Sequence, residues 1–119
     1  MKKLLSALLL VLFASVANAQ SFNQRATVSA TGTGNQTLIA ATTGQRISVY
    51  GWNLSLAAVV NFKFVCGSTD ATGAMQLNAY AMPVTMGGPA YIVCAAGEAL
   101  IGNLGSSTTI GGIIWYSKQ

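Results

Sequence analysis

Residues 46–66 read RISVYGWNLSLAAVVNFKFVC, and their apolar side chains have the spacing of β-structure. In the second part of this stretch the side chains alternate between two faces. The apolar face carries Val60, Phe62 and Phe64. The first part alternates in the same way if Gly51 forms a bulge. A period of two with β-branched and aromatic residues is typical of half-buried strands, so we predict strands at 46–56 and 59–66.

The rest of the chain repeats this pattern of short apolar segments separated by glycine-containing turns. Turn signals at intervals of about 8–12 residues are typical of all-β sandwiches, and no segment has helical periodicity. The other predicted strands are residues 22–30, 37–41, 74–79, 90–94, 100–104 and 109–116. We therefore predict an all-β fold: a single antiparallel β-sandwich, jelly-roll-like, of about eight strands.

The first 19 residues, MKKLLSALLLVLFASVANA, have the pattern of a secretory signal peptide. Two lysines precede an apolar run at 4–16, and Ala17-Asn18-Ala19 supplies the small residues of a cleavage site. The run is shorter than the roughly 20 residues that span a bilayer, so we expect no stable membrane anchor after cleavage. The predicted mature domain is 20–119, exported to the periplasm or the extracellular medium.

The charge of the chain is low and dispersed. The net charge is +4 for the whole sequence, but two of the lysines belong to the predicted signal, which leaves +2. The remaining charged side chains are Arg25, Arg46, Lys63, Lys118, Asp70 and Glu98. Nucleic-acid binding needs clustered basic residues, and so does a polybasic membrane patch, so we expect neither partner. A polar uncharged surface and a surface covered by partners both fit this composition.

Cys66 and Cys94 are the two cysteines of the chain. An exported protein enters an oxidising compartment, where such a pair forms a disulfide. The predicted bridge closes a loop of roughly 29 residues, which the chain-entropy model values at about 3–4 kcal/mol.

The reagents of most catalytic chemistry are scarce. The chain has no histidine, and Asp70 and Glu98 are its two carboxylates. Asp70 lies in a Gly/Ser/Thr loop and Glu98 in a turn, where acids usually bond nearby backbone amides. Two acids are too few for a tight metal site. We expect no enzyme activity, no cofactor and no metal.

The aromatic residues are the best candidates for ligand contact. Aromatic faces beside amide and hydroxyl groups are suited to sugar binding. Tyr80 and Asn78, in the irregular segment 67–88, are the leading candidates, and Trp52 is the third. Core packing is the competing interpretation for each ring.

The second half of the chain resembles small β-sandwich proteins of tailed bacteriophages and prophages, which are virion structural or decoration-like components. The segments that carry the resemblance are GQRISV (44–49), VNFKF (60–64), GST (67–69), TGAM (72–75), AAGEAL (95–100) and GGIIWY (111–116). It covers about residues 28–116, implies a jelly-roll-like fold, and brings no catalytic residues. The signal peptide and the cysteine pair depart from that group.

These observations favour a non-enzymatic exported structural or assembly module. Its expected partners are a second copy or another surface or virion protein, and particle association is one expected location. The alternative function is a secreted carbohydrate- or cell-surface-binding module that uses exposed aromatic residues.

Overall fold

The computed structural model describes residues 24–82 and 89–119, and the predicted signal peptide lies outside them. All of the regular structure in these residues is β-strand, which confirms the all-β prediction. The strands are β1 (Gln24–Ile39), β2 (Ile47–Cys66), β3 (Thr69–Asp70), β4 (Met75–Met82), β5 (Ile92–Val93) and β6 (Leu100–Lys118). No helix in the described part of the chain is long and apolar enough to cross a membrane.

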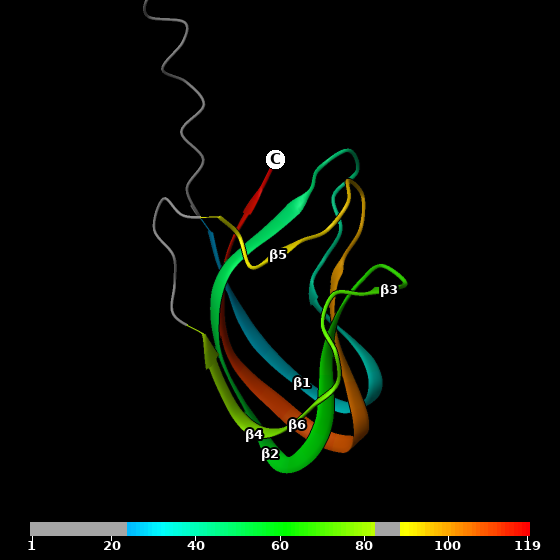
Figure 1. Cartoon of the computed structure of the whole chain (residues 1–119), viewed down its shortest axis with the longest axis vertical. Helices are drawn as coiled ribbons and strands as arrows, with labels where there is room; N and C mark the ends of the chain where they lie inside the picture. The colour runs from blue at the N-terminus through cyan, green and yellow to red at the C-terminus, as the bar shows by residue number, and fades with distance from the viewer. Residues whose placement is uncertain (1–23, 83–88) are drawn as a thin grey trace, which may run out of the picture.

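The six strands form one antiparallel sheet (Figure 1). Its order is β1-β6-β2-β3, and both β4 and β5 also pair with β2. The last strand, β6, therefore lies between β1 and β2. Neither a second sheet nor a jelly-roll order of strands is seen in residues 24–82 and 89–119.

The strand count is six and not about eight. Six predicted strands merge in pairs into three long ones, and the short β3 is a strand that was not predicted. β1 continues through the predicted turn at 31–35, with a register shift between Gly32 and Gly34. β2 joins the two predicted strands at its start and end into one of 20 residues. β6 likewise continues through 105–107. In Figure 1 these long strands curve back so that their two ends approach each other.

The bends fold the sheet over itself and enclose the core between its two halves. Trp52, from the first half of β2, meets Phe64, from the second half, edge to face with ring centroids 4.8 Å apart. Phe62 packs on Phe64 at 4.9 Å. The largest fully buried apolar side chains are Phe62, Phe64, Ile47, Leu54, Leu100, Leu104, Ile110, Ile114 and Val49. Strands that turn back on themselves thus bury one face without a second sheet.

The alternation predicted for β2 is confirmed by its burial. Val60, Phe62 and Phe64 are buried, whereas Asn61 between them is exposed. In the first half of the strand the alternation holds from Trp52 to Leu56, whereas residues 47–51 are all buried. Val65, on the face opposite Phe64, is buried as well.

One close approach between strands needs glycine. Gly112 of β6 pairs with Leu54 of β2 and has φ of +142°. A Cβ at this position would overlap the carbonyl oxygen of Asn53. A side chain at position 112 would therefore force β6 away from β2.

The predicted disulfide is present. Cys66, the last residue of β2, is bonded to Cys94, which follows β5, with Cα atoms 5.2 Å apart. Cys94 also donates its backbone N–H to the carbonyl of Ile47, the first residue of β2. The bridge therefore links the end of β2, at Cys66, to its start, at Ile47, through Cys94.

Two buried hydroxyls, one with a hydrogen-bond partner and one without in the part of the chain that the structure describes, allow the contribution of that bond to stability to be measured. The Thr108 hydroxyl accepts the Ala58 N–H at 3.2 Å, whereas the Ser117 hydroxyl has no partner among the described residues. We expect Thr108→Val to lower the free energy of unfolding by about 1–2 kcal/mol, because it leaves a backbone donor unpaired. Ser117→Ala should leave it unchanged or raise it by up to about 1 kcal/mol. Urea denaturation followed by tryptophan fluorescence measures both, and equal losses would show that Ser117 has a partner.

Candidate functional site

Of the three residues predicted as ligand contacts, the structure describes the side chain of Trp52 alone. Trp52 is 3% exposed, and its ring lies in the core against Phe64 and Tyr91. It cannot offer a face to a ligand in this conformation, because alternation along β2 directs it inward. Tyr80 and Asn78 lie in β4, with Tyr80 opposite Leu54, and their side chains are outside what the structure describes.

A hollow lies beside the Cys66–Cys94 disulfide. Its volume is about 390 Å³. It is lined by Cys66, Thr69, Asp70, Ala71, Tyr91, Ile92, Val93, Ala95 and Glu98. We call it the disulfide hollow. A smaller depression of about 190 Å³, which includes Arg46 and Tyr50, shares Val93 with it.

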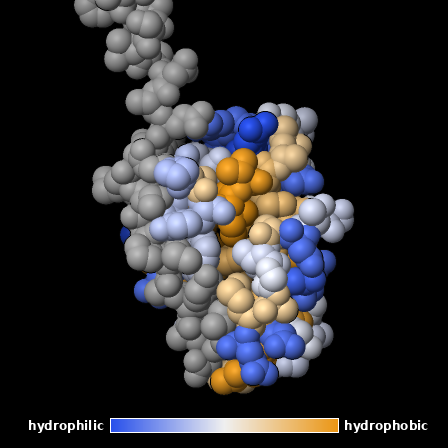
Figure 2. All heavy atoms as spheres, viewed as in Figure 1, coloured by the Kyte–Doolittle hydropathy of each residue, from blue (hydrophilic) through white to orange (hydrophobic). Residues whose placement is uncertain are grey.

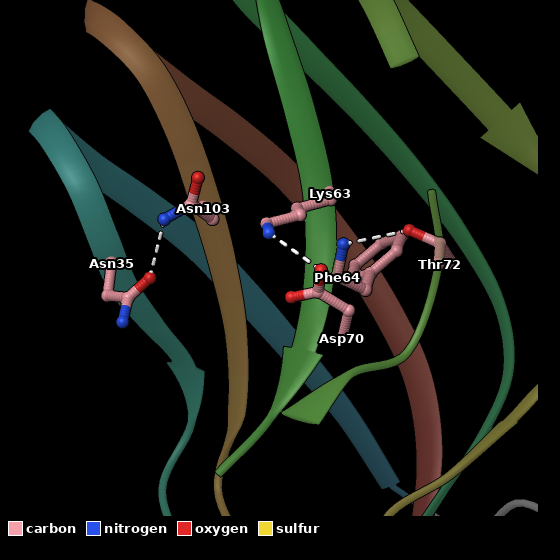
Figure 3. Close-up of polar contacts among 6 residues, drawn as sticks. All are labelled: Asn35, Lys63, Phe64, Asp70, Thr72 and Asn103. Carbon is pink, nitrogen blue, oxygen red and sulfur yellow. Dashed lines mark hydrogen bonds and ion pairs between the residues drawn. The ribbon is translucent and has the colours of Figure 1, made fainter. Parts of the chain in front are cut away.

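One wall of the disulfide hollow is the β3 segment, which is tied firmly to the end of β2. The backbone N–H groups of Ala71 and Thr72 donate to the Phe64 carbonyl at 2.8 and 3.2 Å. The Phe64 N–H in turn donates to the Thr72 hydroxyl at 3.0 Å. Figure 3 shows this last bond, and also Lys63 of β2 reaching Asp70 of β3 in an ion pair of 2.8 Å. The Asp70 carboxylate is thus oriented while 57% of the side chain stays exposed.

The opposite wall is β5 and the turn that follows it. Tyr91 donates its backbone N–H to Val49, which anchors this segment to β2. In the turn, Glu98 accepts the Ala95 N–H at 3.0 Å through one carboxylate oxygen. The Glu98 side chain lies over Gly67, where a Cβ would come within 3.2 Å of it. Glu98 therefore closes the turn and also reaches the start of the β3 segment.

The apolar part of the disulfide hollow comes from β5. Ile92 is buried, whereas Tyr91 and Val93 on either side of it are 42% and 54% exposed. The Tyr91 ring meets Trp52 edge to face at 5.8 Å, so the core holds it in place. In Figure 2 strongly hydrophobic atoms gather on the viewed face at the position of β5, with hydrophilic residues beside them. Exposed apolar side chains beside oriented polar groups are the usual composition of a binding site.

The electrostatics of the disulfide hollow are acidic. Asp70 and Glu98, the two side-chain carboxylates of the sequence, both line it. Lys63 offsets the charge of Asp70 through their 2.8 Å ion pair, so Glu98 is the main source of the negative charge. Among the described residues no group of three or more His, Cys, Asp or Glu side chains is placed to hold a metal ion.

The spacing of the acids from the cysteines could have predicted this site. Each acid lies four positions after a cysteine, Asp70 after Cys66 and Glu98 after Cys94. A disulfide between those cysteines brings the two following segments together. Tyr91, three positions before Cys94, is carried to the same place.

The outer edge of β1 is the second surface of interest. Among the described residues β1 pairs with β6 alone, so its other edge carries no paired strand. The exposed side chains along it are small and mostly hydroxylic: Thr27, Ser29, Thr31 and Thr33. Thr31 hydrogen-bonds to Thr109 of β6 at 2.9 Å. Further along β1, Asn103 of β6 donates to Asn35 at 2.6 Å (Figure 3).

No protein-family model, no curated protein and no solved structure matches this chain. Function is therefore inferred from the two surfaces of the described residues, the disulfide hollow and the β1 edge. Of these, the edge is the more extensive, since it runs along 16 residues.

Proposed function

We propose that the protein is an exported, non-enzymatic structural module that assembles with copies of itself through the outer edge of β1. The observation that carries the proposal is the length and composition of that edge. An unpaired strand edge presents a row of backbone N–H and C=O groups that can pair with another chain. We assign to the protein the structural role of jelly-roll-like virion proteins, which its sequence resembles.

The edge of β1 has few of the features that prevent pairing. Proteins usually protect an edge with charged side chains, proline, bulges or very short strands. β1 has 16 residues, no proline and a single charged residue, Arg25. Its pairing with β6 is in regular register from Gln24 to Gly32, before the first shift. This nine-residue segment is the part best suited to accept a partner strand.

A second copy fits this segment in an antiparallel, two-fold arrangement. Isologous pairing is the commonest way in which identical chains associate. If the two-fold axis passes at Val28, the middle of the segment, Thr27 of one copy faces Ser29 of the other. Arg25 then faces Thr31, so the two arginines lie at opposite ends of the ribbon, roughly 20 Å apart. No like charges oppose each other in this register.

Export of the module is supported by the disulfide, which is typical of an oxidising compartment. The test is mass spectrometry of cell fractions, culture medium and density-purified particles. A mature peptide that begins at Gln20 and migrates with particles supports a virion or vesicle component. A soluble mature chain supports export and removes the virion assignment, and an uncleaved chain confined to the cytoplasm contradicts export.

Self-association is tested by adding charge to the edge. We expect the mature protein to form a defined oligomer in size-exclusion chromatography with light scattering. The double variant Thr27→Lys/Ser29→Lys should shift it to the monomer, because the new lysines would face each other across the two-fold axis.

The matched control is Asn53→Lys/Ser55→Lys. It makes the same charge change on exposed positions of β2, which is flanked by β6 and β4. This control should retain the oligomer. A monomeric wild-type protein, or equal dissociation of both variants, would contradict assembly through the β1 edge.

A further inference from the structure

The disulfide hollow has the features of a small-molecule site that is distinct from the β1 edge. Its two walls, the β3 segment and β5 with its turn, are joined by the Cys66–Cys94 bond and fastened to β2 by backbone hydrogen bonds. The walls are therefore positioned before any ligand arrives, which lowers the entropic cost of binding. Its volume, about 390 Å³, lies within the range of small-molecule pockets.

We propose that the disulfide hollow binds a neutral or amine-bearing sugar, with Tyr91 as the platform for the sugar ring. Tyr91 is 42% exposed and is held from behind by its edge contact with Trp52 and by its backbone bond to Val49. An aromatic ring that is fixed and partly exposed offers an apolar surface to the C–H face of a sugar at little cost in side-chain entropy. Val93, 54% exposed, extends this surface.

The polar groups of the disulfide hollow suit the hydroxyls of a sugar. Asp70 and Glu98 are each oriented by a bond to one oxygen, from Lys63 and from the Ala95 N–H respectively. A carboxylate has about four acceptor positions, so each retains capacity for hydroxyl or ammonium donors. Thr69, also exposed, adds a hydroxyl that both donates and accepts.

The charge of the lining selects among sugars. Two carboxylates line the disulfide hollow, and Lys63 offsets one of them, Asp70. The Glu98 carboxylate then leaves a net negative charge, which disfavours a sialic acid, sulfate or phosphate group. An amino group would instead be attracted, and neutral hydroxyls would be accepted. The site thus discriminates against anionic glycans.

The test uses the mature protein with its disulfide intact and four probes: cellobiose, N,N′-diacetylchitobiose, the corresponding free-amine disaccharide, and sialyllactose. Saturation-transfer NMR and titration calorimetry measure binding. We expect at least one of the first three to bind at or below about 10 mM, and sialyllactose not to bind. Amide shifts should change in 69–71 and 91–98 and not along β1.

Variants separate the site from the fold. Tyr91→Ala should weaken binding by about tenfold or more, and Tyr91→Phe by no more than about threefold. Val59→Ala, at an exposed apolar residue outside the disulfide hollow, is the control and should have no effect. Glu98→Gln should weaken the amine-bearing sugar more than the neutral ones. If Tyr91→Ala unfolds, the Tyr91→Phe variant and the amide shifts of the wild type still decide the outcome.

Three results would overturn the proposal: no binding of any probe at about 10 mM, shifts that fall elsewhere, or sialyllactose bound as well as the neutral sugars. The proposal is independent of assembly, because the Thr27→Lys/Ser29→Lys variant should bind sugar as the wild type does. Loss of the oligomer and loss of the sugar site are therefore distinguishable.

Discussion

Replacing Gly112 by alanine is expected to abolish folding, whereas the same change at the adjacent Gly111 should leave the domain folded. A Cβ at position 112 would overlap the carbonyl oxygen of Asn53 in β2, and the backbone at Gly112, with φ of +142°, is one that L-residues rarely adopt. At Gly111 a Cβ would lie 3.7 Å from the Val28 carbonyl oxygen, an ordinary contact.

The expected cost of Gly112→Ala is more than about 4 kcal/mol, because a clash with backbone inside a sheet cannot be relieved by a side-chain rotation. Such a loss is a large share of the total stability of a small domain, about 5–15 kcal/mol. Circular dichroism and thermal melting of the purified variants measure it. A folded Gly112→Ala protein within about 1 kcal/mol of Gly111→Ala would show that β6 and β2 are not packed this closely.

Removal of the disulfide has the second largest expected effect. The double variant Cys66→Ala/Cys94→Ala should lower the free energy of unfolding by about 3–4 kcal/mol, since the sequence separation is 28 residues and the unlinked chain gains loop entropy when unfolded. The loss should be greatest around β3 and β5, because the bond links Cys66, which pairs with β3, to Cys94, which follows β5.

Denaturant titration of the oxidised wild type, the reduced wild type and the double variant measures this effect. Reduced wild type and double variant should agree within about 1 kcal/mol, because each lacks the cross-link and retains a small apolar side chain at both positions. A double variant as stable as the oxidised protein would mean that backbone hydrogen bonds alone hold the two walls. The same variant should also lose sugar binding, as the disulfide hollow loosens.

The sequence predicted the class of fold because local alternation decides it. The alternation of Val60, Phe62 and Phe64 predicts a strand without information from the rest of the chain. The disulfide was predictable because an exported chain with two cysteines has one possible pairing. The number of strands was wrong because Gly105-Ser106-Ser107 has the composition of a turn. Whether such a segment reverses the chain or bends it depends on the pairing of β6 with its neighbours, which is not local information.

The candidate site was predicted only in its chemistry. Aromatic residues were singled out and the two acids were interpreted as structural, but exposure separates Trp52, which is buried, from Tyr91, which is partly exposed. In β2 both halves turn one face to the core, so an aromatic residue in phase with Leu54 had to be buried. Tyr91 is partly exposed because it alternates with the buried Ile92 just before β5. That strand has two residues, too few to reveal its phase in the sequence.

The position of β6 between β1 and β2 also determines when this chain can fold. Gln24 pairs with Tyr116, and Ile47 pairs with Lys118, so the first and second long strands are both completed by the last. Pairings this distant in sequence make folding slow, because the entropy of ordering a long loop is lost before any contact between the strands stabilises it. A growing chain that lacks its final residues leaves β1 without a neighbour and β2 with one edge open. Closure of the sheet therefore waits for β6, and a ribosome or a translocation channel that still holds β6 keeps β1 out of the sheet.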